Sequence, residues 1–330
     1  TFNTNSPDLM TKPPCGGIIG LRKAIATHLE QFRGMHVQPE QIFIGAGTEY
    51  LYGLLIQLLG FDKKYAIENP GYEKIAAIYN SYNVKYHYIP MDEKGILVNE
   101  LENSDADVVH ISPSHHFPTG IVTPISRRYE LLGWAAASAD RYIIEDDYDS
   151  EFRLTGKPIP SLQSMDITQK VIYINTFTKS LSSTMRISYM VLPPELANRF
   201  LEQLSFYSCT VSNFEQYALM RFINEGYFEK HINRMRNFYH KQRDILLDAI
   251  KKSPLSSHVT IMEEDSGLHF LLKLKMEISD KEFMQRALQK GVKLNSLSAY
   301  YHDSPDDFAA HTFIINYSYL NTEHLAEAIK

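Results

Sequence analysis

The stretch that decides the fold is Val171-Ile172-Tyr173-Ile174-Asn175-Thr176-Phe177-Thr178-Lys179-Ser180. Its first four residues form a short apolar run typical of a buried strand, and a lysine among hydroxyl side chains follows directly. Arg186 comes seven residues after Lys179, and the earlier run 143–148 reads Ile-Ile-Glu-Asp-Asp-Tyr. Most lysines are solvated surface residues. A lysine at a strand end, with an arginine beyond it and an acid-tyrosine pair before it, indicates a binding site instead.

Short β-rich runs alternate with helical stretches over most of the chain before Pro193-Pro194. This alternation predicts an α/β fold with a mostly parallel sheet covered by helices on both faces. We expect seven strands in a large domain spanning 21–205, after an N-terminal arm over 1–20. The runs are 41–44, 64–67, 84–89, 107–111, 142–144, 171–174 and 187–192. Each candidate site segment follows such a run, and binding sites in parallel sheets collect at the carboxyl ends of the strands.

The character of the sequence changes after Pro193-Pro194. Long helical stretches follow, of which 225–252 is the clearest, and short strands then alternate with helices. We expect a long helix and a smaller α+β C-terminal domain over 206–330. Its predicted strands are 259–262, 268–274 and 312–316, and its predicted helices are 280–289 and 322–330.

The composition is that of an ordinary globular protein, with 44% hydrophobic and 22% charged residues in 330. The formal net charge of −6 and the absence of a basic run argue against direct electrostatic binding of nucleic acid by this chain. Two cysteines, Cys15 and Cys209, favour free thiols and a cytoplasmic setting. No apolar run approaches the length of a membrane span, and residues 1–5 do not resemble a signal peptide. Since there is no initiator Met, we expect a fragment of a longer chain.

The residues around Lys179 suit pyridoxal 5'-phosphate (PLP). This cofactor requires a lysine that forms a Schiff base and an acid that holds the pyridine nitrogen, so that the ring acts as an electron sink. Lys179 supplies the amine, and either Asp146 or Asp147 supplies the acid. Tyr148 lies on the same side of an extended chain as Asp146 and is placed to donate to the phenolate oxygen. Tyr72, after Pro70-Gly71, is the candidate for a flat group covering the ring.

The phosphate of PLP requires backbone N–H groups, hydroxyls and an arginine. Gly47 and Thr48 open a predicted helix, whose N-terminal N–H groups and dipole favour an anion. Thr176, Thr178 and Arg186 surround Lys179 and complete the predicted cradle.

Other interpretations of these motifs are weaker. Gly45-Ala46-Gly47 could begin a dinucleotide fingerprint, but Tyr50 occupies the third glycine position. The acids at 145–147 and 149 are possible metal ligands by type, but the histidines that would join them, His115 and His116, lie in another loop. We therefore predict no metal site.

Several longer stretches resemble the MocR subfamily of GntR-type bacterial transcription regulators. These proteins join an N-terminal winged helix-turn-helix to a domain of the fold-type I aminotransferase kind. The similarity covers essentially the whole chain, and the segment 145–153 is the most specific part. The stretches that carry it are Pro113 to Gly120, Ser126-Arg127-Arg128 with Leu131 to Ala135, Ile144 to Arg153, Thr176 to Leu181 and Met185 to Tyr189.

The resemblance implies roles for individual residues. Lys179 would be the Schiff-base lysine, Asp146 the partner of the pyridine nitrogen, Tyr148 the partner of the phenolate oxygen, and Tyr72 the residue over the ring. It also adds His115 to the cofactor site. A domain-swapped, head-to-tail homodimer is implied, with the cofactor near the subunit interface and with DNA contacted only through the helix-turn-helix, which this chain does not contain.

The effector site of this family falls here on Lys74, His116 and the segment 313–317, at Ile314. The GABA-responsive member is expected to grip the ligand carboxylate with two arginines, and this chain has Lys74 and Ile314 at those positions. A lysine lacks the bidentate fork of arginine, and Ile314 removes a cation, which argues against GABA. A family segment is also absent near Leu9 and Met10, where residues are either deleted or missing.

Two functions follow from this resemblance. In the first, an amine effector, such as an amino acid or a small peptide like D-alanyl-D-alanine, or PLP itself, is sensed. An amine of this kind replaces Lys179 as the Schiff-base partner (an external aldimine) and biases a conformational equilibrium that a DNA-binding domain reads. The alternative is a catalytically active PLP-dependent aminotransferase, in which Lys179 also moves a proton. The sequence favours the sensor.

Overall fold

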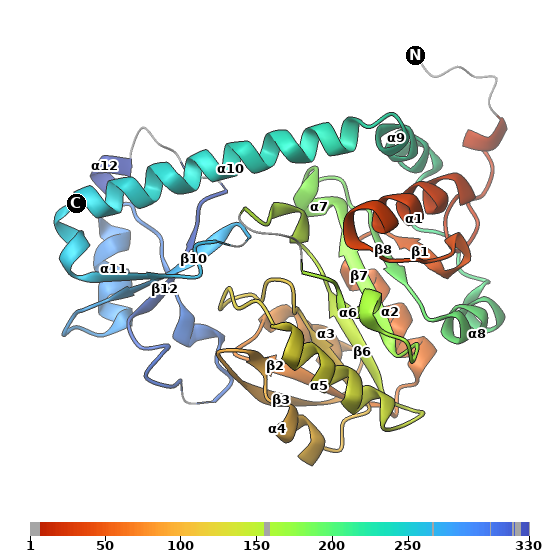
Figure 1. Ribbon diagram of the computed structural model, residues 1–330, viewed down its shortest axis with the longest axis horizontal. Coiled ribbons are helices and arrows are strands. Elements are labelled where there is room, and N and C mark those ends of the chain that lie inside the picture. The colour runs from red at the N-terminus through yellow and green to blue at the C-terminus, as the bar shows by residue number, and fades with distance from the viewer. Residues whose placement is uncertain are drawn as a thin grey trace.

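The computed structural model describes residues 7–154, 159–265, 267–303, 305–318, 320 and 325–329. An eight-stranded mixed sheet forms the large part of the molecule, and a four-stranded antiparallel sheet forms a smaller part beside it (Figure 1). The α/β fold with a mostly parallel sheet and a smaller α+β part is therefore confirmed. The predicted count of seven strands was one too low, because the two-residue strand β4 (Gly95–Ile96) pairs with the edge.

The large sheet has the strand order β1-β8-β7-β6-β5-β2-β3-β4. Its central neighbours from β7 through β6, β5 and β2 to β3 pair in parallel, whereas β8 pairs antiparallel with both β7 and β1. The strands other than β4 are β1 (Ile42–Gly45), β2 (Lys64–Asn69), β3 (Lys85–Asp92), β5 (Val108–Ile111), β6 (Tyr142–Asp146), β7 (Val171–Thr176) and β8 (Ser188–Val191).

Successive residues of a central strand bury side chains on opposite faces of this sheet. Ile143 packs in a cluster with Leu131 and Trp134 of α5 (Ile125–Ala136), whereas Ile144 packs with residues of α2 (Thr48–Leu59) and α8 (Pro194–Leu204). Helices therefore cover both faces, and this explains why the strands are continuous apolar runs rather than alternating ones. Further helices of this part are α3 (Glu73–Ser81), α4 (Val98–Asn103), α6 (Leu162–Met165) and α7 (Phe177–Ser180).

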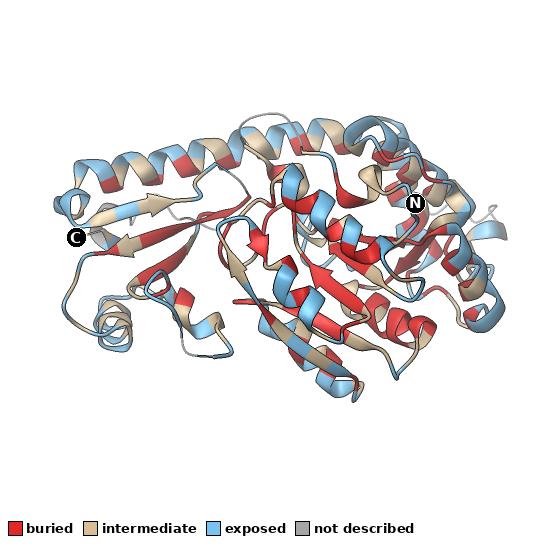
Figure 2. Ribbon diagram, turned by 60° about the horizontal axis from the view of Figure 1, so that its bottom comes forward, coloured by how far each residue is buried: buried red, intermediate tan, exposed pale blue. Residues whose placement is uncertain are grey.

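A 26-residue helix, α10 (Tyr227–Lys252), runs along both parts of the molecule (Figure 1). Its buried residues recur on one side, which Figure 2 shows as red patches facing the sheets. Before it, α9 (Asn213–Asn224) packs against α1 (Ile19–Arg33) of the large part. The predicted domain boundary near residue 205 stays a prediction.

The smaller sheet has the order β11-β12-β10-β9, all pairs antiparallel. It packs its apolar residues, such as Phe270 and Phe313, into the same core cluster as α1 and α10. Its strands are β9 (Val259–Met262), β10 (His269–Leu274), β11 (Asn295–Ser296) and β12 (Thr312–Asn316), and its helices are α11 (Asp280–Gln289) and α12 (Leu325–Ala328). The predicted helix 322–330 falls partly on residues 322–324 and 330, which lie outside the described residues.

None of the helices in the described ranges combines the length and the apolar composition that crossing a membrane requires. Cys15 and Cys209 are both free thiols.

Candidate functional site

A cavity of about 690 Å³ lies at the carboxyl ends of the parallel strands, with the smaller part of the molecule closing one side. Parallel strands deliver the residues at their carboxyl ends to the same edge of a sheet, as expected for a doubly wound fold. Nine of the thirteen predicted site residues line it: Thr48, Tyr72, Lys74, Asp146, Tyr148, Thr176, Thr178, Lys179 and Arg186.

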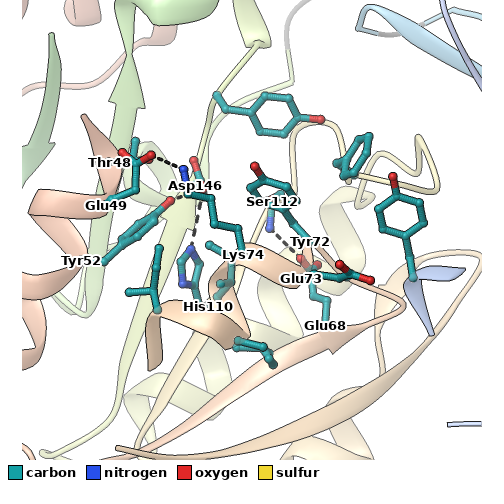
Figure 3. A pocket seen from close by; sticks show the side chains of 18 of the residues that line it. Thr48, Glu49, Tyr52, Glu68, Tyr72, Glu73, Lys74, His110, Ser112 and Asp146 are labelled. Atoms are coloured by element: carbon teal, nitrogen blue, oxygen red, sulfur yellow. Dashed lines mark hydrogen bonds and ion pairs between the residues drawn. The ribbon is translucent and has the colours of Figure 1, made fainter. Parts of the chain in front are cut away.

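Asp146 ends β6, and one of its two carboxylate oxygens has no hydrogen-bond partner. Its Oδ2 accepts a hydrogen bond of 2.5 Å from the Tyr52 hydroxyl and lies 3.8 Å from Nε2 of His110 (Figure 3). Tyr79 bonds Nδ1 of His110 at 2.8 Å and so fixes the imidazole ring. Oδ1 of Asp146 is buried and has no hydrogen-bond partner. A buried acceptor of this kind is costly unless a donor such as a protonated ring nitrogen meets it.

The neighbouring Asp147 forms its contacts away from the cavity. Its Oδ2 pairs with Arg33 at 2.7 Å and accepts hydrogen bonds from Tyr173 at 2.6 Å and Ser150 at 2.9 Å. Asp147 does not line the cavity. Of the two acids that the sequence left open, only Asp146 faces the cavity.

Tyr148 lines the cavity and is held from behind by His115. The two side chains lie 3.3 Å apart, between the Tyr148 hydroxyl and Nδ1 of His115, which is also 2.8 Å from Oδ2 of Asp149. Burial, followed by the charge of Asp149, raises the pKa of Tyr148 well above its ordinary value. Tyr148 therefore stays protonated near neutral pH and is available as a hydrogen-bond donor.

One end of the cavity is suited to an anion. α2 begins there at Thr48, after Gly47 with φ of +94°, and a side chain at Gly47 would meet Nη2 of Arg186 at 2.4 Å. The glycine thus lets the helix N-terminus and the guanidinium approach each other, and both attract negative charge. Glu49 pairs with Arg186 at 2.7 Å and also with Lys74 (Figure 3). Two of the predicted anion-binding cations are therefore bridged by a carboxylate of the chain itself.

The hydroxyls of Thr176 and Thr178 lie 2.9 Å apart at the start of α7, and Ser188 donates to Thr176 at 2.8 Å. Lys179 follows in α7, on the rim of the same cavity. Its side chain is largely exposed, and its amine forms no hydrogen bond or ion pair with any described residue. The lysine is free to reach a ligand inside the cavity.

Four predicted residues do not line the cavity, namely Gly47, His115, His116 and Ile314. His115 and Gly47 support residues that do, as described above. His116 is buried, with Nδ1 at 2.7 Å from Thr119 and Nε2 at 3.4 Å from Oε2 of Glu68. Ile314 packs in a small apolar cluster with Leu271 and Leu297, behind Phe117 and Tyr300. The roles predicted for these four stay predictions.

Several lining residues were not predicted from the sequence. Tyr52 lies in α2, which reads as an apolar core helix, and Glu68 and His110 lie within strands. Acidic or histidine residues near the carboxyl end of a buried strand are themselves a signal that could have identified the last two. The other unpredicted residues include Glu49, Glu73, Tyr88, Phe117, Tyr300, Tyr301, His302 and Asn316.

The smaller part of the molecule is tied to the large part at this cavity. The N–H of Gly71 donates to the carbonyl of Tyr300 at 3.2 Å, and the N–H of His302 donates to Oδ1 of Asn69 at 3.0 Å. The rings of Tyr88 and His302 stack with centroids 4.0 Å apart. Residues 300–302 therefore pack directly against the turn 69–72 at the cavity, and we call these three residues the roof.

No group of three or more His, Cys, Asp or Glu side chains is placed to hold a metal ion in the part of the chain that the structure describes. The cavity instead combines an acid, a phenol, a lysine and an anion-binding end. This set can bind a phosphorylated aromatic aldehyde and form an imine to it.

Comparisons with known proteins agree with this arrangement. No family model matches the chain. The chain is 40% identical over 318 residues to the HTH-type transcriptional regulator YdeL of Bacillus subtilis, covering 96% of this chain and 68% of the relative. It is 31% identical to the probable rhizopine catabolism regulatory protein MocR of Rhizobium meliloti, covering 94% of this chain and 62% of that protein. The chain therefore spans about two thirds of the length of these relatives.

Among solved structures, the kynurenine aminotransferase of Pyrococcus horikoshii in complex with PMP matches with a TM-score of 0.81 and 27% identity. The match covers 99% of this chain and 82% of that one. An aminotransferase-like fold thus occurs in a chain that is 40% and 31% identical to these two regulators. The chain belongs to the MocR subfamily of GntR-type transcription regulators.

Proposed function

We propose that this chain is the effector-sensing part of a regulator, that it binds PLP at the cavity, and that an amine effector competes with Lys179 for the cofactor. The observation that carries the proposal is the unpaired Oδ1 of Asp146. Asp146 lines the same cavity as Lys179, whose amine has no partner among the described residues, and as the pair formed by the α2 N-terminus and Arg186.

The residues present fit the cofactor group by group. Asp146 supplies the acceptor for the ring nitrogen, and Tyr52 and His110 hold it in place. Tyr148 supplies a protonated phenol, and Tyr72 lies on the cavity wall as an exposed aromatic surface. When bound, PLP supplies an aldehyde that binds amines covalently and an aromatic ring that withdraws electrons.

The chain contributes to sensing through a competition between the amine of Lys179 and the amine of the effector for the cofactor. Lys179 is solvent-exposed, so its release from a ligand leaves no buried charge behind. The roof at 300–302 contacts the turn 69–72 directly above the cavity, so the contents of the cavity are sensed by both parts of the molecule. A ligand shifts such an equilibrium only by its difference in affinity for the two arrangements. We propose that a helix-turn-helix outside this chain reads the shift, in a cytoplasmic homodimer.

The covalent link to Lys179 is tested by reduction with borohydride and peptide mapping. PLP-treated protein should carry a pyridoxyl group on the peptide that contains Lys179. Lys179→Ala should carry none and should lack the visible absorbance of the bound cofactor, whereas Lys94→Ala, a change at an exposed turn residue, should behave like the parent. Labelling of another lysine, or an unchanged spectrum in Lys179→Ala, would refute the assignment.

A second candidate function is transamination, favoured by the structural match to aminotransferases over nearly the whole chain. Lys179 would then also carry a proton between two carbon atoms of the reacting group. Incubation of PLP-loaded protein with an amino donor and a keto acid separates the two. Product formed over many turnovers supports the enzyme, and a spectral change without a new amino acid supports the sensor.

A further inference from the structure

Part of the cavity carries a buried carboxylate that no cation neutralises. Glu68 lines the cavity, and its side chain is only 9% exposed. Its Oε2 accepts a hydrogen bond of 3.1 Å from the N–H of Ser112 and lies 3.4 Å from His116. Burial lowers the pKa of His116 to about 3, so this imidazole is neutral. Within the described ranges, neither a lysine nor an arginine forms an ion pair with Glu68.

Acidic side chains outnumber lysines and arginines in the lining of the cavity. The lysines and arginine of the lining are Lys74, Lys179 and Arg186, and the first and last of these already pair with Glu49. If the cofactor engages Lys179 and Asp146 as proposed above, Glu68 and Glu73 are the carboxylates left over. Figure 3 shows these two glutamates near Ser112 and Tyr72, on the other side of Lys74 from Thr48 and Tyr52.

The same region is walled by aromatic rings. Phe117 packs edge-on against Tyr72, with centroids 5.8 Å apart, and against Tyr300, with centroids 5.3 Å apart. Glu73 lines the cavity together with these rings, and burial followed by the charge of Glu73 raises the pKa of Tyr300. Aromatic faces and carboxylates both attract a cation, and they repel or fail to bind a carboxylate.

We propose that the effector carries a second cationic group, as a basic amino acid or a diamine does, and that this group binds between Glu68, Glu73 and the aromatic wall. The inference rests on the proposed function, because it assigns the effector's first amine to the cofactor. Burial raises the pKa of Glu68 to about 8, and a cation beside it favours the ionised carboxylate, since a buried charge is tolerated when it is paired.

The test is calorimetric titration of PLP-loaded protein with a matched series of amino acids. L-lysine, L-norleucine and L-2-aminoadipate have the same carbon chain and end in an ammonium, a methyl and a carboxylate group. L-ornithine is one methylene shorter than L-lysine and tests how far the second cationic group must extend. We expect L-lysine or L-ornithine to bind at least about tenfold more tightly than L-norleucine, which corresponds to one charge-assisted hydrogen bond, and L-2-aminoadipate to bind most weakly.

Variants connect the preference to the residues. Glu68→Gln should weaken the basic ligand about tenfold and leave L-norleucine unchanged, and Glu73→Gln, at an exposed position, should weaken it by a smaller factor. Glu93→Gln, an exposed change in a turn away from the cavity, should have no effect.

Equal binding of L-norleucine, tighter binding of L-2-aminoadipate, or no binding of either basic amino acid by cofactor-loaded protein would overturn the inference. An unaltered preference in Glu68→Gln would do the same. Failure of the proposed function looks different, since the protein would then take up no PLP on Lys179.

Discussion

Asp146 and Asp147 are consecutive at the end of β6, yet their carboxylates serve opposite sides of the sheet. Asp146 lines the cavity, whereas Asp147 does not and is fully buried with its Oδ2 paired to Arg33 at 2.7 Å. Successive side chains of an extended strand alternate between faces, so one residue position separates a ligand-binding acid from a structural one.

The two acids should therefore respond differently to the same substitution. Asp147→Asn leaves Arg33 buried without its counter-charge, and we expect a loss of about 3–5 kcal/mol in the free energy of unfolding. Asp146→Asn should cost much less stability and should weaken PLP binding instead. Urea unfolding of the apo proteins and spectral titration with PLP measure the two quantities. The assignment fails if Asp146→Asn is the more destabilised of the pair and binds PLP normally.

Glu49 bridges Lys74 and Arg186 in the absence of a bound anion. Because its carboxylate competes for the guanidinium, Glu49→Gln should bind PLP severalfold more tightly than the parent, and inorganic phosphate likewise. Arg186→Gln should show the reverse. The exposed pair Arg286 and Glu282 in α11 provides a control, since Glu282→Gln should change neither affinity. Weaker phosphate binding in Glu49→Gln would contradict the competition.

Gly47 is the glycine whose replacement should affect the anion-binding end. Gly47→Ala places a methyl group within 2.4 Å of Arg186 at a φ of +94°, so we expect weaker PLP binding together with a loss of stability. Gly133→Ala is the matched control. It lies exposed in α5 with nothing within 4 Å of the added methyl, and it should raise the free energy of unfolding by about 0.5–1 kcal/mol. Thermal unfolding and PLP titration of both variants test the contrast.

Glu68 should make the stability of the apo protein depend on pH. Burial raises its pKa from the ordinary 4.5 to about 8 in the folded state. The folded chain therefore holds a proton that the unfolded chain releases, and stability falls as pH rises from about 4.5 through 8, by at most about 1.4 kcal/mol per pH unit. The groups that face Glu68 are the N–H of Ser112, the neutral His116, Asp146 and Tyr148.

Glu68→Gln should remove this slope. The variant should match the parent near pH 4 and exceed it in free energy of unfolding near pH 8, as measured by urea unfolding across the range. Glu93→Gln should follow the parent at every pH. A Glu68→Gln variant that is less stable than the parent at pH 8 would show that the carboxylate is ionised and stabilising there.

The sequence was sufficient for the fold class because the apolar runs and the helical stretches are local signals. It also located Asp146, Tyr148 and Lys179, since each follows a strand and the carboxyl ends of parallel strands meet. It did not separate Asp146 from Asp147, because that choice depends on the position of Arg33 in α1, more than 100 residues earlier. Glu68 lies near the carboxyl end of a strand, which is a usable signal, but its surroundings depend on Ser112, which lies 44 residues away in the chain.

Sequence patterns could not identify the roof residues 300–302 either, because their position also depends on contacts between distant parts of the chain. Tyr300 and His302 reach the cavity only because the smaller sheet folds back onto the turn 69–72, about 230 residues away in the chain. The number of strands was underestimated because β4 consists of two residues, which is too short to produce a periodic signal.

The contacts of residues 300–302 with the turn 69–72 hold the smaller part of the molecule against the segment that lines the cavity. Gly71 and Asn69, which contact residues 300–302, belong to the same segment as Glu68 and Tyr72, which line the cavity. One continuous piece of chain therefore forms both the contact and part of the cavity wall. A change in the contact between residues 300–302 and the turn 69–72 is therefore expected to shift this part of the cavity wall. We therefore expect a ligand that touches this wall to change how firmly the smaller part is held against the large part.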